Sequence, residues 1–199
     1  MSLDSATLHE AAGQIGALPS GIKPIASGMR LEGPAFTVSS PPANNLWLHK
    51  AIAEASAGDV LVVEVGGHYE VGYWGEIMTV AARARGVVGL VIDGCVRDAE
   101  QITALGFPVC SRGLCIRGTG KSATPPGSGS GSLNEPIEIG EVTISPGDLI
   151  VGDGDGVVAI PSDRVEEVLE KSRERLDKEA EVMERLRRGE TTLDIYGWS

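Results

Sequence analysis

The segment from Gly75 to Asp98 restricts the fold of this chain more than any other part of the sequence. Residues 76–85 have a helical pattern that Gly86 can end, and the apolar run 87–92 is typical of a strand buried on both faces. We interpret Asp93-Gly94 as a tight turn after that strand. Such a unit can bring the start of its helix and the residues after its strand to one edge of a sheet.

The same alternation of elements continues along much of the chain. The expected strands are 34–38, 59–65 and 108–111, and the expected helices are 5–18, 46–57 and 99–105. This alternation favours an α/β architecture. Residues 137–160 instead carry hairpin signals, after a glycine- and serine-rich stretch over 122–134 that predicts a loop. A long amphipathic helical arm is expected at about 162–189, and residues 1–199 are expected to form a single domain.

Charge and composition exclude several classes of protein. The formal net charge is −11, and the basic residues near the C-terminus alternate with glutamates on one predicted helix. A nucleic-acid partner is therefore not expected, because binding to phosphates needs a basic surface. No stretch is apolar over the length of a membrane span, so no membrane partner is expected either. Three cysteines without a paired spacing indicate reduced thiols and a cytoplasmic protein.

Asp98 and Arg97 stand side by side after the buried strand, where their chemistry is complementary. Mg²⁺ and Mn²⁺ prefer oxygen ligands, and Mg²⁺ often takes one protein carboxylate with water and substrate in the other positions. Asp98 can serve in this way, or it can cap the helix that follows it. Arg97 can grip a carboxylate in a bidentate fork, aided by the backbone amides of Ile77 and Met78 at the start of the preceding helix.

The spacing of these residues resembles that of the class II pyruvate aldolases, which cleave 4-hydroxy-4-methyl-2-oxoglutarate and 4-carboxy-4-hydroxy-2-oxoadipate. Their pattern is an acidic residue, twenty intervening residues and then Arg-Asp, and here it is Glu76 followed by Arg97-Asp98. The regulator of ribonuclease E activity A belongs to the same fold family. Further similar segments are 33–38, Asn44-Asn45, 146–148 and 152–158. The resemblance implies a three-layer β/β/α sandwich of the swivelling phosphohistidine-domain type.

The resemblance also implies roles for individual residues. Gly75, Glu76, Ile77, Met78 and Arg97 would form the pyruvate-binding set, with Glu76 and Arg97 catalytic and Asp98 as the ligand of Mg²⁺ or Mn²⁺. Glu76 would hold a water that transfers protons. Read from the sequence alone, Glu76 can also be a favourable charge in the first turn of a helix.

Three further residues have alternative interpretations. The aldolases take an acidic residue from a neighbouring subunit, which predicts a homotrimer or hexamer, and Glu179 is the candidate for that residue. A solvated helix face is the alternative explanation of Glu179, and it is the simpler of the two. Asn44 and Asn45 either line the site or cap the helix that follows them.

The resulting expectation is a divalent-metal-dependent aldolase that cleaves 2-oxo diacids to pyruvate and also decarboxylates oxaloacetate. The alternative is a non-catalytic protein that regulates a ribonuclease through an acidic surface. Glu76 favours the enzyme, because the regulators resemble this chain but carry glycine at that position.

Overall fold

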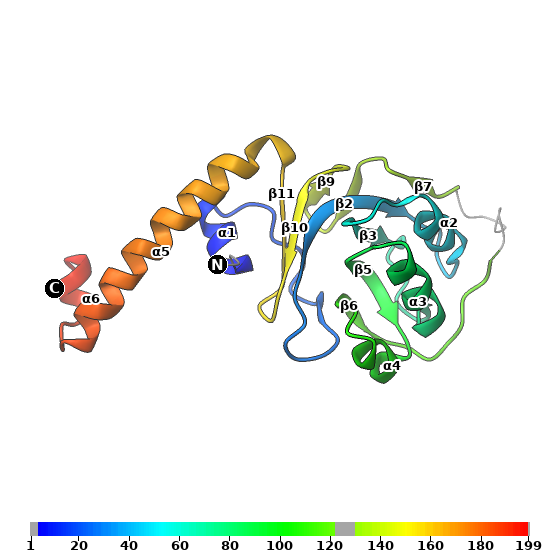
Figure 1. Cartoon of the computed structure of the whole chain (residues 1–199), viewed down its shortest axis with the longest axis horizontal. Helices are drawn as coiled ribbons and strands as arrows, with labels where there is room; N and C mark the ends of the chain where they lie inside the picture. Colours follow the sequence, from blue (N-terminus) through cyan, green and yellow to red (C-terminus); the bar gives the residue numbers. More distant parts are fainter. Residues whose placement is uncertain (1–3, 122–129, 199) are drawn as a thin grey trace.

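A computed structural model describes residues 4–121 and 130–198 and shows a central sheet against which helices pack (Figure 1). Part of the loop that we predicted over 122–134 thus lies outside the described residues. The strands are β1 (Lys23–Pro24), β2 (Leu31–Ser39), β3 (Val60–Glu64), β4 (Gly72–Trp74), β5 (Gly89–Val96), β6 (Val109–Leu114), β7 (Ser132–Leu133), β8 (Ile137–Ile139), β9 (Val142–Ile144), β10 (Leu149–Gly152) and β11 (Val157–Ile160). The helices are α1 (Ser5–Ala11), α2 (Leu46–Glu54), α3 (Glu76–Ala84), α4 (Ala99–Ala104), the 3₁₀ turn η1 (Ser162–Arg164), α5 (Val165–Arg187) and α6 (Thr192–Tyr196).

The main sheet has the order β1-β6-β5-β3-β2-β10-β11, and its centre is parallel. Strand β3 pairs in parallel with both β2 and β5, and β5 pairs in parallel with β6. Parallel strands need crossover connections, and α2, α3 and α4 supply them on the same face of the sheet (Figure 1). The predicted α/β class is confirmed.

Alternate residues of β3 show how the layers are held together. Leu61 and Val63 face the cluster of apolar side chains under α2 and α3, whereas Val60 and Val62 face a second cluster. That second cluster includes Ile137, Ile139 and Ile144 from the β8–β9 hairpin, so the hairpin covers the other face of the sheet. The three-layer β/β/α sandwich is therefore confirmed. A strand buried on both faces is apolar at nearly every position, as the sequence of β3 is.

The turn that we predicted at Asp93-Gly94 is wrong. Strand β5 continues through both residues to Val96, and all eight of its residues are buried. Its register against β6 shifts between Ile92 and Cys95, which indicates a bulge instead of a chain reversal. Beyond the bulge, Cys95 and Val96 pair with both β4 and β6, and the Asp93 carboxylate forms an ion pair with Arg112 of β6.

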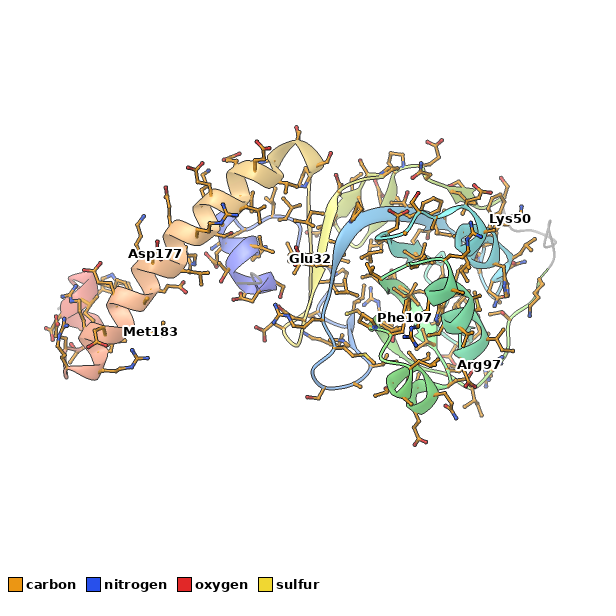
Figure 2. All side chains as sticks on the ribbon, viewed as in Figure 1. Glu32, Lys50, Arg97, Phe107, Asp177 and Met183 are labelled. Atoms are coloured by element: carbon orange, nitrogen blue, oxygen red, sulfur yellow. The ribbon has the colours of Figure 1, made fainter. Side chains whose placement is uncertain are left out.

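The C-terminal helix α5 extends away from the sheet together with α6 (Figures 1 and 2). Its first half packs on α1 and β11, where Val168 is fully buried beside Leu8 and Ile160. In Figure 2 the labelled Asp177 and Met183 of the arm lie far from Arg97, which is at the opposite end of the molecule. None of the described helices is long and apolar enough to cross a membrane.

Asp153, in the turn between β10 and β11, ties the N-terminal helix to the sheet. Its carboxylate accepts hydrogen bonds from the backbone N–H and the hydroxyl of Ser5, both at 2.7 Å. Burial alone would raise the pKa of Asp153, but these bonds, one from the Asp155 amide and the charge of Arg30 outweigh burial and lower it.

We expect Asp153→Asn to lower the free energy of unfolding by about 1–3 kcal/mol at pH 7. Because the folded pKa lies below the unfolded value, the stabilising effect of the carboxylate is complete above the unfolded pKa, near 4, and is lost as the pH falls through the folded pKa. Urea unfolding of both proteins at several pH values checks this prediction. A stability difference that stayed constant into the acid range would contradict it.

Candidate active site

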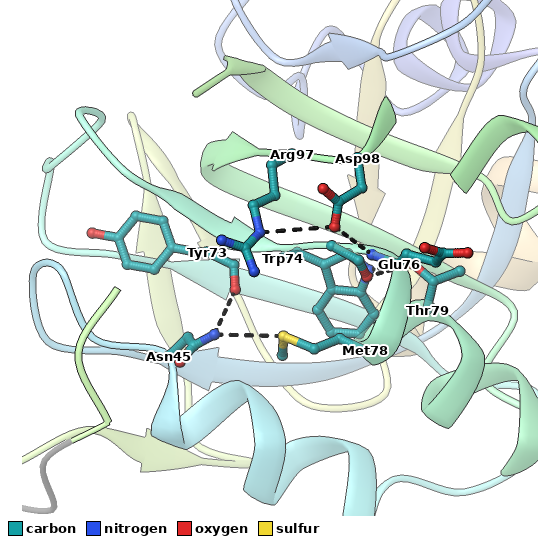
Figure 3. Close-up of polar contacts among 9 residues, drawn as sticks. Asn45, Tyr73, Trp74, Glu76, Met78, Thr79, Arg97 and Asp98 are labelled. Carbon is teal, nitrogen blue, oxygen red and sulfur yellow. Dashed lines mark hydrogen bonds and ion pairs between the residues drawn. The ribbon is translucent and has the colours of Figure 1, made fainter. Parts of the chain in front are cut away.

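The start of α3 and the end of β5 meet at one edge of the sheet, as the sequence predicted. The backbone N–H of Glu76, the first residue of α3, donates a 3.0 Å hydrogen bond to Oδ2 of Asp98 (Figure 3). The backbone N–H of Arg97 donates to the Trp74 carbonyl at 2.9 Å, so the chain segments on either side of the site are joined twice. Short polar contacts thus fix Asp98 against the positive end of the helix dipole.

The structure does not show the alternative role of Asp98, in which its side chain would cap α4. Asp98 does precede α4, but its side chain makes no capping hydrogen bond there. Its backbone is left-handed, with φ of 57°, a conformation that Asp adopts more readily than most residues. The carboxylate therefore serves the start of α3, and its other oxygen, Oδ1, has no hydrogen-bond partner among the described residues.

Gly75 is required by the closeness of this contact. A Cβ at residue 75 would lie 2.3 Å from Oδ2 of Asp98 and 3.3 Å from the Arg97 side chain. The φ of Gly75 is −158°, which any residue can adopt, so the requirement is steric. Gly72 is similarly restricted, because its Cβ would meet the Cys115 carbonyl at 2.4 Å.

Arg97 holds its guanidinium over the open side of the site. Nε lies 3.8 Å from Oδ2 of Asp98, and the side chain is about half exposed, at 47%. Figure 3 shows the guanidinium extending from Asp98 toward the side of the site where Asn45 and Tyr73 lie. This geometry leaves the guanidinium N–H groups available to a ligand.

A cavity of about 370 Å³ lies beside these groups. Five of the residues that we predicted line it, namely Gly75, Ile77, Met78, Arg97 and Asp98. The first amides of α3 have no partner within the helix and can act as donors at this end. The residues that sequence reasoning missed are His49, Gly72, Tyr73, Trp74, Gly118, Thr119 and Lys121. The glycine-rich run around Lys121 was the one available signal for the loop residues among them.

The sequence left two roles open for Asn44 and Asn45, namely lining the site and capping the helix that follows. The structure gives the two residues different roles. Asn44 Oδ1 accepts a 2.9 Å hydrogen bond from the Leu46 amide at the start of α2, so it supports that helix. Asn45 occupies the position before α2 without capping it and lines the cavity. Its Nδ2 donates to the Tyr73 carbonyl at 3.0 Å and lies 3.5 Å from the Met78 sulfur (Figure 3).

The acidic candidates Glu76 and Glu179 lie outside the cavity of this chain. The Glu76 side chain is exposed, and in Figure 3 its carboxylate lies on the far side of Asp98 from the Arg97 guanidinium. Among the described residues its carboxylate has no hydrogen bond or ion pair. Glu179 lies on α5 and pairs with Arg175 at 2.8 Å, remote from Arg97 along the arm. A role in a neighbouring subunit's site stays a prediction.

The donor set suits a hydrated hard cation. The described residues contain no group of three or more His, Cys, Asp or Glu side chains that could hold a metal ion. Asp98 nonetheless offers an unpaired carboxylate oxygen, and its side chain is 38% exposed at the cavity. One carboxylate with several waters is a common arrangement for Mg²⁺. The residues therefore fit such an ion, held by Asp98 alone within this chain.

Comparison with known proteins places this chain in one family. The family model RraA-like, Aldolase/RraA, matches residues 5–159, and the chain belongs to this family. The chain is 40% identical to "Putative 4-hydroxy-4-methyl-2-oxoglutarate aldolase" of Halalkalibacterium halodurans over 158 residues, which cover 79% of this chain and 72% of that protein.

Two solved structures extend the comparison to the fold. One is an uncharacterized protein from Pseudomonas syringae pv. tomato, with a TM-score of 0.83, 34% identity and coverage of 95% of this chain and 86% of the other. Another is the RNA-processing inhibitor RraA from Thermus thermophilis, with a TM-score of 0.71, 25% identity and coverage of 81% and 94%. The family that the sequence resembles is therefore confirmed, and it includes proteins named as aldolases and proteins named as regulators.

We expect Gly75→Ala to break the hydrogen bond between the Glu76 amide and Asp98, because the new Cβ would overlap Oδ2. Amide hydrogen exchange at Glu76 should become faster and the melting temperature should fall. Gly118→Ala is the matched control, since its Cβ would make an ordinary 3.8 Å contact with Arg97. Equal effects of the two substitutions would show that the closeness at Gly75 is not what fixes Asp98.

Proposed function

We propose that this protein is a divalent-metal-dependent carbon–carbon lyase that cleaves 4-hydroxy-2-oxo diacids, of the 4-hydroxy-4-methyl-2-oxoglutarate type, to release pyruvate. Oxaloacetate decarboxylation is proposed as a side activity. The observation that carries this proposal is the convergence of Asp98, Arg97 and the start of α3 on one cavity. The 40% identity to a protein with an aldolase name supports the reaction class.

The residues of the chain divide the work of binding. Arg97 would bind the C1 carboxylate of the substrate through its guanidinium, since the planar fork matches a carboxylate. The amides of Ile77 and Met78 would add donors at the positive end of the α3 dipole. Asp98 would hold Mg²⁺ or Mn²⁺, and the bound ion would supply Lewis-acid polarisation of the 2-oxo group.

Proton transfer would be the role of Glu76. Acting through a water, its carboxylate would take the proton of the C4 hydroxyl as the C3–C4 bond breaks and the bonding pair passes to the pyruvate half. A proton returned to C3 then completes the methyl group of pyruvate. Arg97 would stabilise the negative charge that develops between these two steps. Glu76 does not line the cavity of this chain, so proton transfer needs a water to bridge its carboxylate and the C4 hydroxyl.

A regulator that binds a ribonuclease is the second candidate. The structural likeness to the Thermus RNA-processing inhibitor and the net charge of −11 favour it. An assay for pyruvate release distinguishes the two candidates, because the regulator needs no chemistry at Asp98.

We expect pyruvate release from oxaloacetate and from 4-hydroxy-4-methyl-2-oxoglutarate to require Mg²⁺ or Mn²⁺ and to be lost in Asp98→Asn. A neutral amide is a much weaker ligand for a hard cation than a carboxylate. A coupled assay with lactate dehydrogenase, with and without excess EDTA, measures both effects. Full turnover in EDTA would exclude the metal mechanism, and a wild type inactive with either ion would favour the regulator.

We expect Glu76→Gln to lower aldol cleavage by about 10²–10⁴-fold, the usual contribution of a placed proton-transfer group. Oxaloacetate decarboxylation should fall less, because that substrate has no C4 hydroxyl to deprotonate. Glu100→Gln is the matched control, as an exposed glutamate in the first turn of α4. If both activities of Glu76→Gln equal those of the control, Glu76 is only a favourable charge at a helix start.

A further inference from the structure

One wall of the cavity is not used by the groups assigned to the pyruvyl half of the substrate. It is formed by His49 of α2 and by the loop that carries Gly118, Thr119 and Lys121. The cavity volume of about 370 Å³ lies within the range of about 300–1,000 Å³ typical of small-molecule sites, which leaves room beyond a three-carbon acid.

Backbone contacts hold this loop in place on two sides. The Gly120 N–H donates to the Ala43 carbonyl at 2.8 Å, and the Asn45 N–H donates to the Gly120 carbonyl at 3.1 Å. A Cβ at Gly118 would lie 3.8 Å from Nη1 of Arg97, so the loop also lies next to the guanidinium. Backbone contacts therefore fix the residue before Lys121 against the start of α2, and Lys121 itself lines the cavity.

The charge of this wall is positive although the whole protein is strongly acidic. Arg97 and Lys121 both line the cavity, and Asp98 is the one carboxylate among the described residues that line it. Burial first and the nearby charge of Lys121 second lower the pKa of His49 below its ordinary value. His49 is therefore neutral near pH 7, and Lys121 carries the positive charge of the wall.

We propose that Lys121 binds a second anionic group of the ligand, in addition to the carboxylate bound by Arg97. Lys121 is then the residue that selects 2-oxo acids with a distal carboxylate over 2-oxo acids of the same length whose distal end is uncharged. The inference rests on the proposed function, because it takes Arg97 as the site of the C1 carboxylate. It adds Lys121 to the proposed binding residues, and the contribution of Lys121 to affinity should depend on the distal carboxylate of the ligand.

Two five-carbon ligands test this assignment without turnover. 2-Oxoglutarate and 2-oxopentanoate share the 2-oxo acid end, and they differ only in the distal carboxylate. Calorimetric titration in the presence of Mg²⁺ should show that the wild type binds 2-oxoglutarate about 10-fold more tightly than 2-oxopentanoate, a difference of about 1.4 kcal/mol in binding free energy. Lys121→Met should bring the two affinities together by weakening 2-oxoglutarate alone.

Lys50→Met is the matched control. Lys50 is exposed, lies over the Trp47 ring at 3.9 Å and does not line the cavity, yet its loss changes the net charge equally. This variant should keep the preference for 2-oxoglutarate. If it loses the preference as Lys121→Met does, the effect is one of overall charge and the assignment is overturned.

The remaining outcomes separate this inference from the proposed function. Equal binding of both ligands by the wild type, or a preference that survives in Lys121→Met, would overturn the role of Lys121 and leave the lyase proposal intact. Arg97→Lys should weaken both ligands alike. Binding of neither ligand by the wild type would overturn the proposed 2-oxo acid site, and the role of Lys121 with it.

Discussion

The hydrogen bond from the Glu76 amide to Asp98 is the contact on which the rest of the site depends. It joins the first residue of α3 to the residue that follows β5, so a helix start and a strand end are fixed against each other. Gly75 makes the approach possible because any side chain there would overlap the carboxylate. Asp98 in turn needs its left-handed backbone to turn away from α4 and toward α3. Arg97 and the cavity take their positions from this arrangement.

The central fold was predictable because its elements have strong local signals. Strand β3 is apolar at nearly every position, which indicates burial on both faces, and the structure divides its residues between two apolar clusters. Strand β5 shows the limit of such reasoning. Asp93-Gly94 looks like a turn from local preference, but the strand continues through it and Asp93 pairs with Arg112 of the neighbouring strand. That partner is distant in the sequence, so no local pattern could have found it.

Which candidate residues lie together was predictable only within one helix–strand unit. Residues carried by α3 and the end of β5 came together as expected, because one helix–strand unit contains them all. His49 and Lys121 join the site through the bonds of Gly120 to Ala43 and Asn45, which link segments far apart in the chain. Only the assembled fold reveals these contacts. The positions of Glu76 and Glu179 relative to a neighbouring subunit depend on assembly, which one chain does not contain.

The contrast between the acidic surface and the cationic cavity affects how quickly a ligand can arrive. At low ionic strength, where the Debye length is long, a net charge of −11 repels an approaching anion well before it reaches the cavity, although Arg97 and Lys121 attract it once it has entered. Added salt screens the long-range repulsion more than the short-range attraction. Association of an anionic ligand should therefore become faster at moderate ionic strength, the reverse of the behaviour of enzymes whose overall charge steers their substrates inward.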